Sequence, residues 1–172
     1  MENGQKFTYK GIEFIKLDDV EINGKKGALC ITSKIWEYLP FDHNWRKDVY
    51  NNFKESDIKR VLNTWFLKKL NKKDLLEFEI DLGRYGTDKT YVGLLTVDQY
   101  EKYRDLIPNM DFWWWLASPY RSNGSYVYYV STGGSLLNYG IAGSSYGAVP
   151  ACVFESSILE SPSLDGSGLD RG

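Results

Sequence analysis

Histidine, cysteine and proline are scarce in this 172-residue chain, which contains one histidine, two cysteines and five prolines. Cys30 and Cys152 lie far apart in sequence, and with His43 they supply too few ligands for a structural zinc site. We predict no metal site and expect buried free thiols, with a disulfide as the alternative if the two cysteines lie on strands that meet. His43 has no identifiable nucleophile in its sequence neighbourhood, so we interpret it as a loop or capping residue and not as a general base.

Long apolar runs are also missing. No stretch approaches the ~20 apolar residues of a membrane span. The polar N-terminus, residues 1–6, is not followed by the apolar core of a signal peptide. The net charge of −2 gives no electrostatic attraction to nucleic acid. We therefore expect no membrane insertion, no nucleic-acid partner and synthesis in the cytoplasm. The oligomeric state and any display on a virion or cell surface through a partner stay open.

Charge is nearly absent from residues 112–154, where Arg121 is the only charged residue although 26% of the chain is charged. The stretch opens with Trp113, Trp114 and Trp115 and is otherwise rich in Tyr, Ser, Gly and Asn, which is the composition of an antibody paratope. Tyrosine presents a large, rigid surface, and Ser, Gly and Asn add adaptable hydrogen bonds. Such a segment suits recognition of a macromolecular ligand and is poor at acid–base chemistry, so we predict no catalytic residue and no cofactor.

We predict that the polar and aromatic side chains of this stretch gather on one solvent-facing surface, because tyrosine combines an apolar body with a polar tip. Side chains alternate between the two faces of a strand. Tyr126 and Tyr128 are therefore expected on one face, and Val127 and Tyr129 on the other, with Val127 packed inside. The predicted ligand-binding residues are Tyr120, Ser122, Asn123, Tyr126, Tyr128, Asn138, Tyr139, Ser144, Ser145 and Tyr146.

The three adjacent tryptophans have a different expected role. Three large neighbouring side chains cannot all be exposed without forming an adhesive patch. We predict that Trp114, Trp115 and Leu116 belong to the core and that Trp113 is partly exposed.

The remaining pattern predicts a mixture of strands and helices. An Asn23-Gly24 turn joins two expected strands, and further strands are expected where apolar residues alternate or cluster, over 12–17, 28–32, 76–82, 91–95, 125–131, 135–139 and 148–154. Ser56 is expected to cap one helix, and Thr96 with Gln99 a second that ends near Arg104. Helical spacing predicts a buried face for the first helix made of Ile58, Val61, Leu62, Trp65, Phe66 and Leu70. Residues 36–41 are expected to form an aromatic connector, and residues 140–147 a loop.

Two short motifs carry a resemblance to a known family. The segment from Trp114 to Pro119, Trp-Trp-Leu-Ala-Ser-Pro, resembles the Trp-Trp-Leu-Arg-Ser-Pro signature of a bacterial and phage domain family of unknown function. The segment from Gly147 to Ala151 is similar to its closing Gly-Val-Arg-Pro-Ala motif. The resemblance runs from about residue 12 to residue 154. Ala117 and Val149 stand where the family usually has arginine, so each is either a randomised position or the mark of a distant branch.

That family is similar to the formylglycine-generating-enzyme branch of C-type-lectin folds. The resemblance implies an α+β fold, C-type-lectin-like, with two helices packed on a small antiparallel sheet and long irregular loops. It implies one domain over residues 1–155, with a variable-type binding segment at about 117–149, and we expect a flexible tail over 156–172. The same fold carries the variable proteins of diversity-generating retroelements, in which adenine-directed mutagenesis leaves Tyr, Asn, Ser and Gly.

The resemblance and the composition together predict a non-enzymatic ligand-binding or display protein of a phage or bacterium, with a protein or a cell-surface receptor as its ligand. One alternative is a fixed structural or adhesion module of a phage particle or cell surface. A third is a degenerate enzyme of the formylglycine-generating type. Such enzymes use paired cysteines in the C-terminal half, where this chain has only Cys152.

Three other motifs have a structural interpretation that we prefer. Residues 143–147 match Gly-x-Ser-x-Gly, the nucleophile elbow of hydrolases, but the only histidine lies upstream of Ser145. Residues 19–24 resemble part of a calcium loop, but Cys30 stands where the bidentate glutamate belongs. Glu77, Glu79 and Asp81 could suggest a glycosidase, and we interpret them as the solvated face of a strand.

Overall fold

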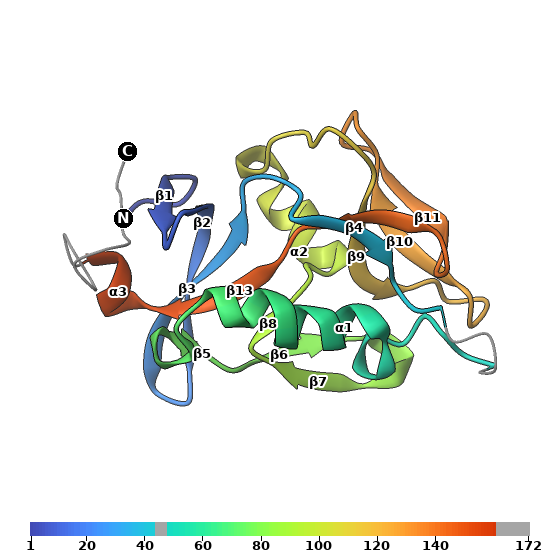
Figure 1. The fold of residues 1–172 in the computed structure, drawn as a ribbon, viewed down its shortest axis with the longest axis horizontal. Helices are drawn as coiled ribbons and strands as arrows, with labels where there is room; N and C mark the ends of the chain where they lie inside the picture. Colours follow the sequence, from blue (N-terminus) through green and yellow to red (C-terminus); the bar gives the residue numbers. More distant parts are fainter. Residues whose placement is uncertain (44–47, 161–172) are drawn as a thin grey trace.

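The computed structural model of this chain describes residues 1–43 and 48–160. The described residues form an α+β fold in which strands dominate and the helices are short (Figure 1). The strands form one six-stranded sheet, one five-stranded sheet and a two-stranded ribbon, in place of the single small sheet that was predicted. In Figure 1 the six-stranded sheet lies on the left and the five-stranded sheet on the right.

The six-stranded sheet joins the beginning of the chain to its end. Its members are β1 (Lys6–Tyr9), β2 (Ile12–Ile22), β3 (Lys25–Thr32), β5 (Leu75–Leu76), β8 (Val92–Gly93) and β13 (Ala151–Glu155). The strand order is β1-β2-β3-β13-β5, and β8 also pairs with β13. The predicted turn between β2 and β3 is confirmed. Asn23 and Gly24 have φ of 52° and 81°, the left-handed values that a tight hairpin turn requires.

The two cysteines meet in this sheet. Cys30 in β3 lies directly opposite Cys152 in β13, and both are buried free thiols. Burial raises the pKa of both thiols, which keeps them protonated and unreactive. Both cysteines are therefore free thiols, as expected, although β3 and β13 do pair as the disulfide alternative required.

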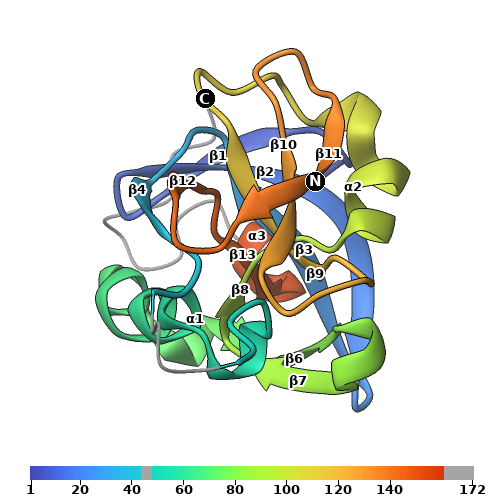
Figure 2. The same cartoon turned by 90° about the vertical axis from the view of Figure 1, so that its right-hand side faces the viewer.

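The five-stranded sheet has the order β11-β10-β9-β12-β4, which places β4 at one edge (Figure 2). Its members are β4 (Glu37–Pro40), β9 (Trp114–Pro119), β10 (Tyr126–Val130), β11 (Leu136–Ile141) and β12 (Ser145–Ala148). Two predictions are wrong here, because β4 occupies the predicted connector, and the end of β11 together with β12 occupies the predicted loop. The residues of β12 have weak strand propensity, but antiparallel pairing with β4 and parallel pairing with β9 hold them in place.

A ribbon of β6 (Phe78–Asp81) and β7 (Thr87–Thr90) lies apart from both sheets. Phe78 and Ile80 are buried, whereas Glu79 and Asp81 are exposed. This alternation confirms the predicted half-buried strand with an acidic outer face. Short 3-10 segments connect the other elements, at η1 (Phe53–Glu55), η3 (Leu67–Lys69), η4 (Lys72–Asp74), η5 (Gly83–Tyr85) and η6 (Arg104–Leu106).

Both predicted helix starts are confirmed. The Ser56 side chain accepts a hydrogen bond from the Lys59 backbone N–H and caps α1 (Asp57–Val61). Thr96 and Gln99 form the capping box of α2 (Val97–Tyr103). The flexible tail predicted from residue 156 is wrong for its first five residues, which form α3 (Ser156–Glu160). Ile158 and Leu159 are buried in α3, while residues 161–172 lie outside the described part of the chain.

The first helix departs from the prediction after Val61, where it continues as a π-helical segment, η2 (Leu62–Phe66). At its end the Leu67 N–H donates to the carbonyl of Leu62, five residues back. The wider turn shifts the helical phase, because a π-turn contains one residue more than an α-turn. Phe66 consequently faces the core and Trp65 faces solvent, with 60% of its surface exposed. The prediction that Trp65 is buried is therefore wrong.

The centre of the core is β9. Trp114 and Trp115 are 1% and 0% exposed and Leu116 is 0% exposed, whereas Trp113 is 39% exposed, as predicted. The Trp115 ring packs edge-on against Phe41 at 5.7 Å, and its indole N–H donates to the Leu39 carbonyl over 2.9 Å. β9 thereby ties the edge strand β4 to the interior.

Replacing either buried tryptophan should destabilise the fold strongly. We expect Trp114→Ala or Trp115→Ala to lower the free energy of unfolding by about 3–5 kcal/mol, because each leaves a large cavity in a close-packed core. Urea denaturation followed by circular dichroism measures this. Trp113→Ala is the matched control and should cost only about 1 kcal/mol. Equal losses for all three variants would contradict the assigned core.

Candidate functional site

Aromatic side chains cover one side of the five-stranded sheet in a connected series, which we call the aromatic face. Trp113 contacts three other rings of the series. Its ring centroid lies 5.5 Å from that of Phe112, 5.9 Å from that of Tyr129 and 5.4 Å from that of Tyr146. Tyr38 extends the series from Phe112, and Tyr139 extends it from Tyr129. The members of the aromatic face are Tyr38, Phe112, Trp113, Tyr129, Tyr139 and Tyr146.

The aromatic face is open to solvent at its outer members. Tyr139 is 58% exposed, Tyr38 51%, and Phe112 and Trp113 39% each. Beneath them Tyr129 is buried, and the half-buried Tyr146 stacks on Trp115 at 4.4 Å. Trp113 and Tyr139 therefore rest on a second layer of rings that is fixed by the core, and Phe112 and Tyr38 extend the series outward from Trp113.

The phenols of Tyr38, Tyr129 and Tyr146 in this face are neutral at physiological pH, because their pKa values are raised. Burial raises the pKa of Tyr129, helped by its hydrogen bond with Tyr139, and burial also raises the pKa of Tyr146. Desolvation raises the pKa of Tyr38 as well, and so does its hydroxyl's 3.1 Å hydrogen bond to the Asp111 carboxylate. These members of the face therefore offer uncharged rings and hydroxyl groups to a ligand.

Three predicted site residues gather elsewhere, in what we call the tyrosine triad. The Tyr120 ring stacks on Tyr126 at 6.3 Å and meets Tyr128 edge-on at 6.2 Å. All three are half-buried. Tyr128 also lines a hollow of about 470 Å³, together with Arg84 and Arg121.

The structure thus divides the predicted surface. Tyr139 and Tyr146 belong to the aromatic face and Tyr120, Tyr126 and Tyr128 to the triad, and no ring contact among the described residues joins the two groups. Successive residues of a strand point to opposite faces, so Tyr128 and Tyr129 separate the groups. The polar members have mixed settings, since Ser122, Asn138 and Ser145 are exposed whereas Asn123 and Ser144 are half-buried.

Asn123 has a structural role that the sequence did not reveal. Its side-chain oxygen accepts the backbone N–H groups of Ser125 and Tyr126, each at 2.9 Å, which closes the turn before β10. The fully buried Asn51 donates from its amide to the carbonyls of Asn123 and Tyr126. Arg84 also donates to the carbonyl of Asn123. Asn51 and Arg84 were missed because neither stands in a motif, and only the tertiary fold brings them to this turn.

The exposed members at the other end of the aromatic face were also missed. Tyr38 lies outside residues 112–154, and Phe112 begins that stretch without being one of its Tyr, Ser, Asn or Gly residues, so composition indicated neither. Pairing of β4 with β12 brings Tyr38 opposite Gly147 and next to the face. The signal in the sequence was the aromatic density of residues 36–41, which was assigned to a connector.

The described residues show no assembled catalytic set. His43 Nδ1 lies 2.6 Å from the Asp57 carboxylate, and His43 is exposed. The Ser145 side chain is exposed on β12 and has no hydrogen bond to His43 in the structure. No group of three or more His, Cys, Asp or Glu side chains in residues 1–43 and 48–160 is arranged to hold a metal ion.

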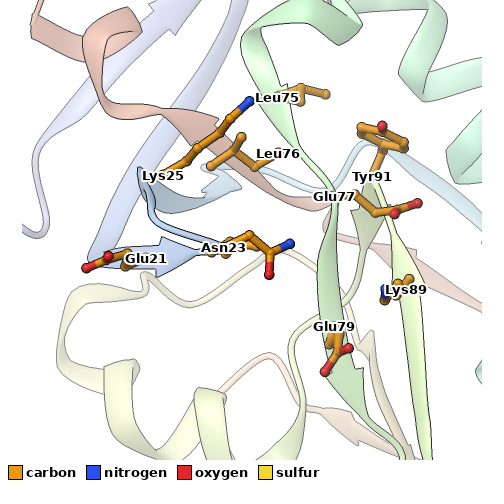
Figure 3. A pocket seen from close by; sticks show the side chains of 10 residues that line it. Glu21, Asn23, Lys25, Leu75, Leu76, Glu77, Glu79, Lys89 and Tyr91 are labelled. Carbon is orange, nitrogen blue, oxygen red and sulfur yellow. The ribbon is translucent and has the colours of Figure 1, made fainter.

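Glu21 of the calcium-like loop and Glu77 and Glu79 of the acidic strand line one pocket, shown in Figure 3. Glu21 points away from the others, and Glu77 and Glu79 point in different directions. Lys25 and Lys89 also line the pocket. The carboxylates do not converge on a common point, so their arrangement supports neither a metal site nor an acid–base pair.

No family model, no curated protein and no solved structure matches this chain. Within the described residues, no helix combines the length and the apolar character needed to cross a bilayer.

The aromatic face depends on a close approach at Gly140. A Cβ atom added to Gly140 would lie 2.8 Å from the Tyr129 ring and 2.9 Å from the Trp115 ring. We expect Gly140→Ala to lower the free energy of unfolding by about 1–3 kcal/mol through overpacking, measured by thermal and urea denaturation. Gly133→Ala, where an added Cβ would meet nothing within 4 Å, is the control and should fall within about 0.5 kcal/mol of the unsubstituted chain. Similar effects of the two substitutions would show that the rings are not packed as described.

Proposed function

We propose that this chain is a non-enzymatic binding protein that presents the aromatic face to a macromolecular ligand, either a protein or a cell-surface receptor. The observation that carries the proposal is the clustering of exposed rings. Six large apolar side chains are exposed among the described residues, and four of them belong to the aromatic face: Tyr38, Phe112, Trp113 and Tyr139. Singly scattered apolar residues need no explanation, but a connected group on one surface indicates an interaction site.

The chemistry of the face suits recognition. Tyrosine and tryptophan are enriched among the residues that dominate binding energy, because they bury a large area and lose little rotamer entropy. The second layer formed by Tyr129, Tyr146 and Trp115 limits the movement of the rings above it. A surface that is already ordered loses less entropy on binding.

We further propose that the fold is C-type-lectin-like and that the chain is a variable protein of a diversity-generating retroelement, in line with the motif resemblance. Tyr139, Asn138 and Ser145 support this proposal, because they are exposed on β11 and β12 and are residue types that adenine-directed mutagenesis produces. Ala117 and Val149 are 0% and 1% exposed. They therefore do not belong to a displayed surface, and they fit a distant branch of the family better than randomised positions.

The flanking DNA tests diversification directly. We expect an adjacent reverse-transcriptase gene and a near-identical repeat of the segment encoding residues 117–149, differing from it only at adenines. The codons of Asn138, Tyr139, Ser145 and Tyr146 should be among the differing positions. A locus with neither element would leave a fixed structural or adhesion module, which uses the same aromatic face without variation. For the third alternative, a degenerate enzyme, residues 1–43 and 48–160 contain no supporting arrangement of side chains.

Removing exposed rings should separate binding from folding. We expect the double variant Phe112→Ser with Tyr139→Ala to lose binding by at least about tenfold, because aromatic anchors carry most interface energy. Flow cytometry of the fluorescently labelled protein on a panel of bacterial cells measures this. The melting temperature should change little, since neither side chain belongs to the buried core.

Tyr128→Ala in the tyrosine triad is the matched control, because it removes a ring from the same sheet outside the aromatic face. It should leave cell binding within about twofold. The proposal fails if the double variant binds as well as the unsubstituted chain, or if Tyr128→Ala alone abolishes binding.

A further inference from the structure

A second concave surface lies between the first helix and the edge strand β4, outside the aromatic face except for the shared residue Tyr38. We call it the edge groove. It has a volume of about 680 Å³, and its apolar lining consists of Trp36, Tyr38, Leu39, Val61 and Trp65. Figure 2 shows β4 and α1 along the same side of the molecule.

Trp65 gives the edge groove its most exposed apolar wall. At 60% it is the most exposed large apolar side chain in the described residues. It is exposed because the π-helical segment η2 turns it outward, whereas an uninterrupted α-helix with the same sequence would direct it inward. π-Helical turns are rare and occur frequently at functional sites.

The π-turn is held in place by Asn63. The Asn63 amide donates to the carbonyl of Lys59 and to the carbonyl of Val92 in β8, each over 2.9 Å. Its side-chain oxygen accepts the Val92 N–H over 3.1 Å. This network fixes the irregular turn to the six-stranded sheet, so that Trp65 is presented from a rigid support.

The opposite wall is an edge strand. Among the described strands, β4 pairs only with β12, so one side of β4 carries no neighbouring strand. An exposed strand edge accepts an extended peptide as an additional strand through main-chain hydrogen bonds. A groove between such an edge and a helix also receives alternate side chains of that peptide.

The charges of the groove indicate which side chains fit. Lys68 and Lys69 line its helical wall, and the Lys68 ammonium lies 4.8 Å from the centre of the Trp65 ring. Glu37 lies on the strand wall. An acidic side chain is therefore favoured on the helical side and disfavoured next to Glu37.

We propose that the edge groove binds an extended segment of a partner protein, which adds to β4 as a sixth strand of that sheet. An apolar side chain of the segment lies against Trp36 and Trp65. An acidic side chain two positions along pairs with Lys68 or Lys69. The edge groove shares only Tyr38 with the aromatic face.

A library of random dodecapeptides displayed on phage and selected against the full 172-residue chain tests the proposal. The selected peptides should share an apolar residue and an acidic residue two positions apart. With a synthetic copy of one such peptide, measured by fluorescence anisotropy, Trp65→Ala should weaken binding by at least about tenfold. Trp65→Phe should restore part of the loss, and both variants should fold normally because the position is exposed.

Charge controls separate the groove from general attraction to a basic surface. Lys68→Gln with Lys69→Gln should weaken peptide binding by at least about fivefold and reduce its salt dependence. Lys72→Gln with Lys73→Gln removes the same charge from outside the groove and should change binding by less than about twofold. Tyr139→Ala, in the aromatic face, should leave peptide binding unchanged, which makes failure of this proposal distinguishable from failure of the proposed function.

Strand addition also predicts slower amide hydrogen exchange within residues 37–39 when the peptide is bound, since Pro40 has no amide hydrogen. Four results would overturn the proposal: no enrichment of peptides over an uncoated surface, equal binding to Trp65→Ala, equal losses from the two lysine pairs, or unchanged exchange in β4.

Discussion

Burial of Trp115 in β9 is the interaction on which the rest of the five-stranded sheet depends. Its ring packs on Phe41, its indole N–H holds the carbonyl of Leu39, and Tyr146 stacks on its other side. One side chain therefore connects the core to β4 at the edge of the sheet and to β12 between β4 and β9. Neither β4 nor β12 has a strong intrinsic preference for extended structure. The contacts with Trp115 and the pairing with neighbouring strands hold both in place.

The same arrangement explains why aromatic residues are tolerated at the surface. Exposed rings usually promote nonspecific association, and proteins limit such patches. Here the outer rings stand on an ordered inner layer, and the hydroxyl groups of Tyr38 and Tyr139 keep polar atoms at the surface. The edge groove uses a related solution on the neighbouring side of β4, where Lys68 lies beside the Trp65 ring. Both surfaces combine apolar area with a rigid support.

Local sequence signals predicted the elements that local chemistry determines. The Asn23-Gly24 turn, the Ser56 cap and the Thr96/Gln99 capping box involve residues within a few positions of each other, so their sequence is sufficient. The exposure of Trp65 depends on Asn63 bonding to β8, and β12 depends on two distant strands, so neither could be derived from a window of sequence. The candidate site was predicted in part for the same reason. Composition indicated Tyr139 and Tyr146, but only the fold places Tyr38 and Phe112 beside them and assigns Asn123 to a turn.

The pairing of β3 with β13 has a consequence for how the chain is made. β13 lies between β3 and the short strands β5 and β8, so the centre of the six-stranded sheet is the last of its strands to be synthesised. The edge of β3 on that side and the strands β5 and β8 consequently have no strand partner until β13 has been synthesised. Contacts of such wide sequence separation form late and slowly. Nascent chains of this protein therefore expose unpaired strand edges until β13 has been made, the interval in which chaperones and aggregation compete for them.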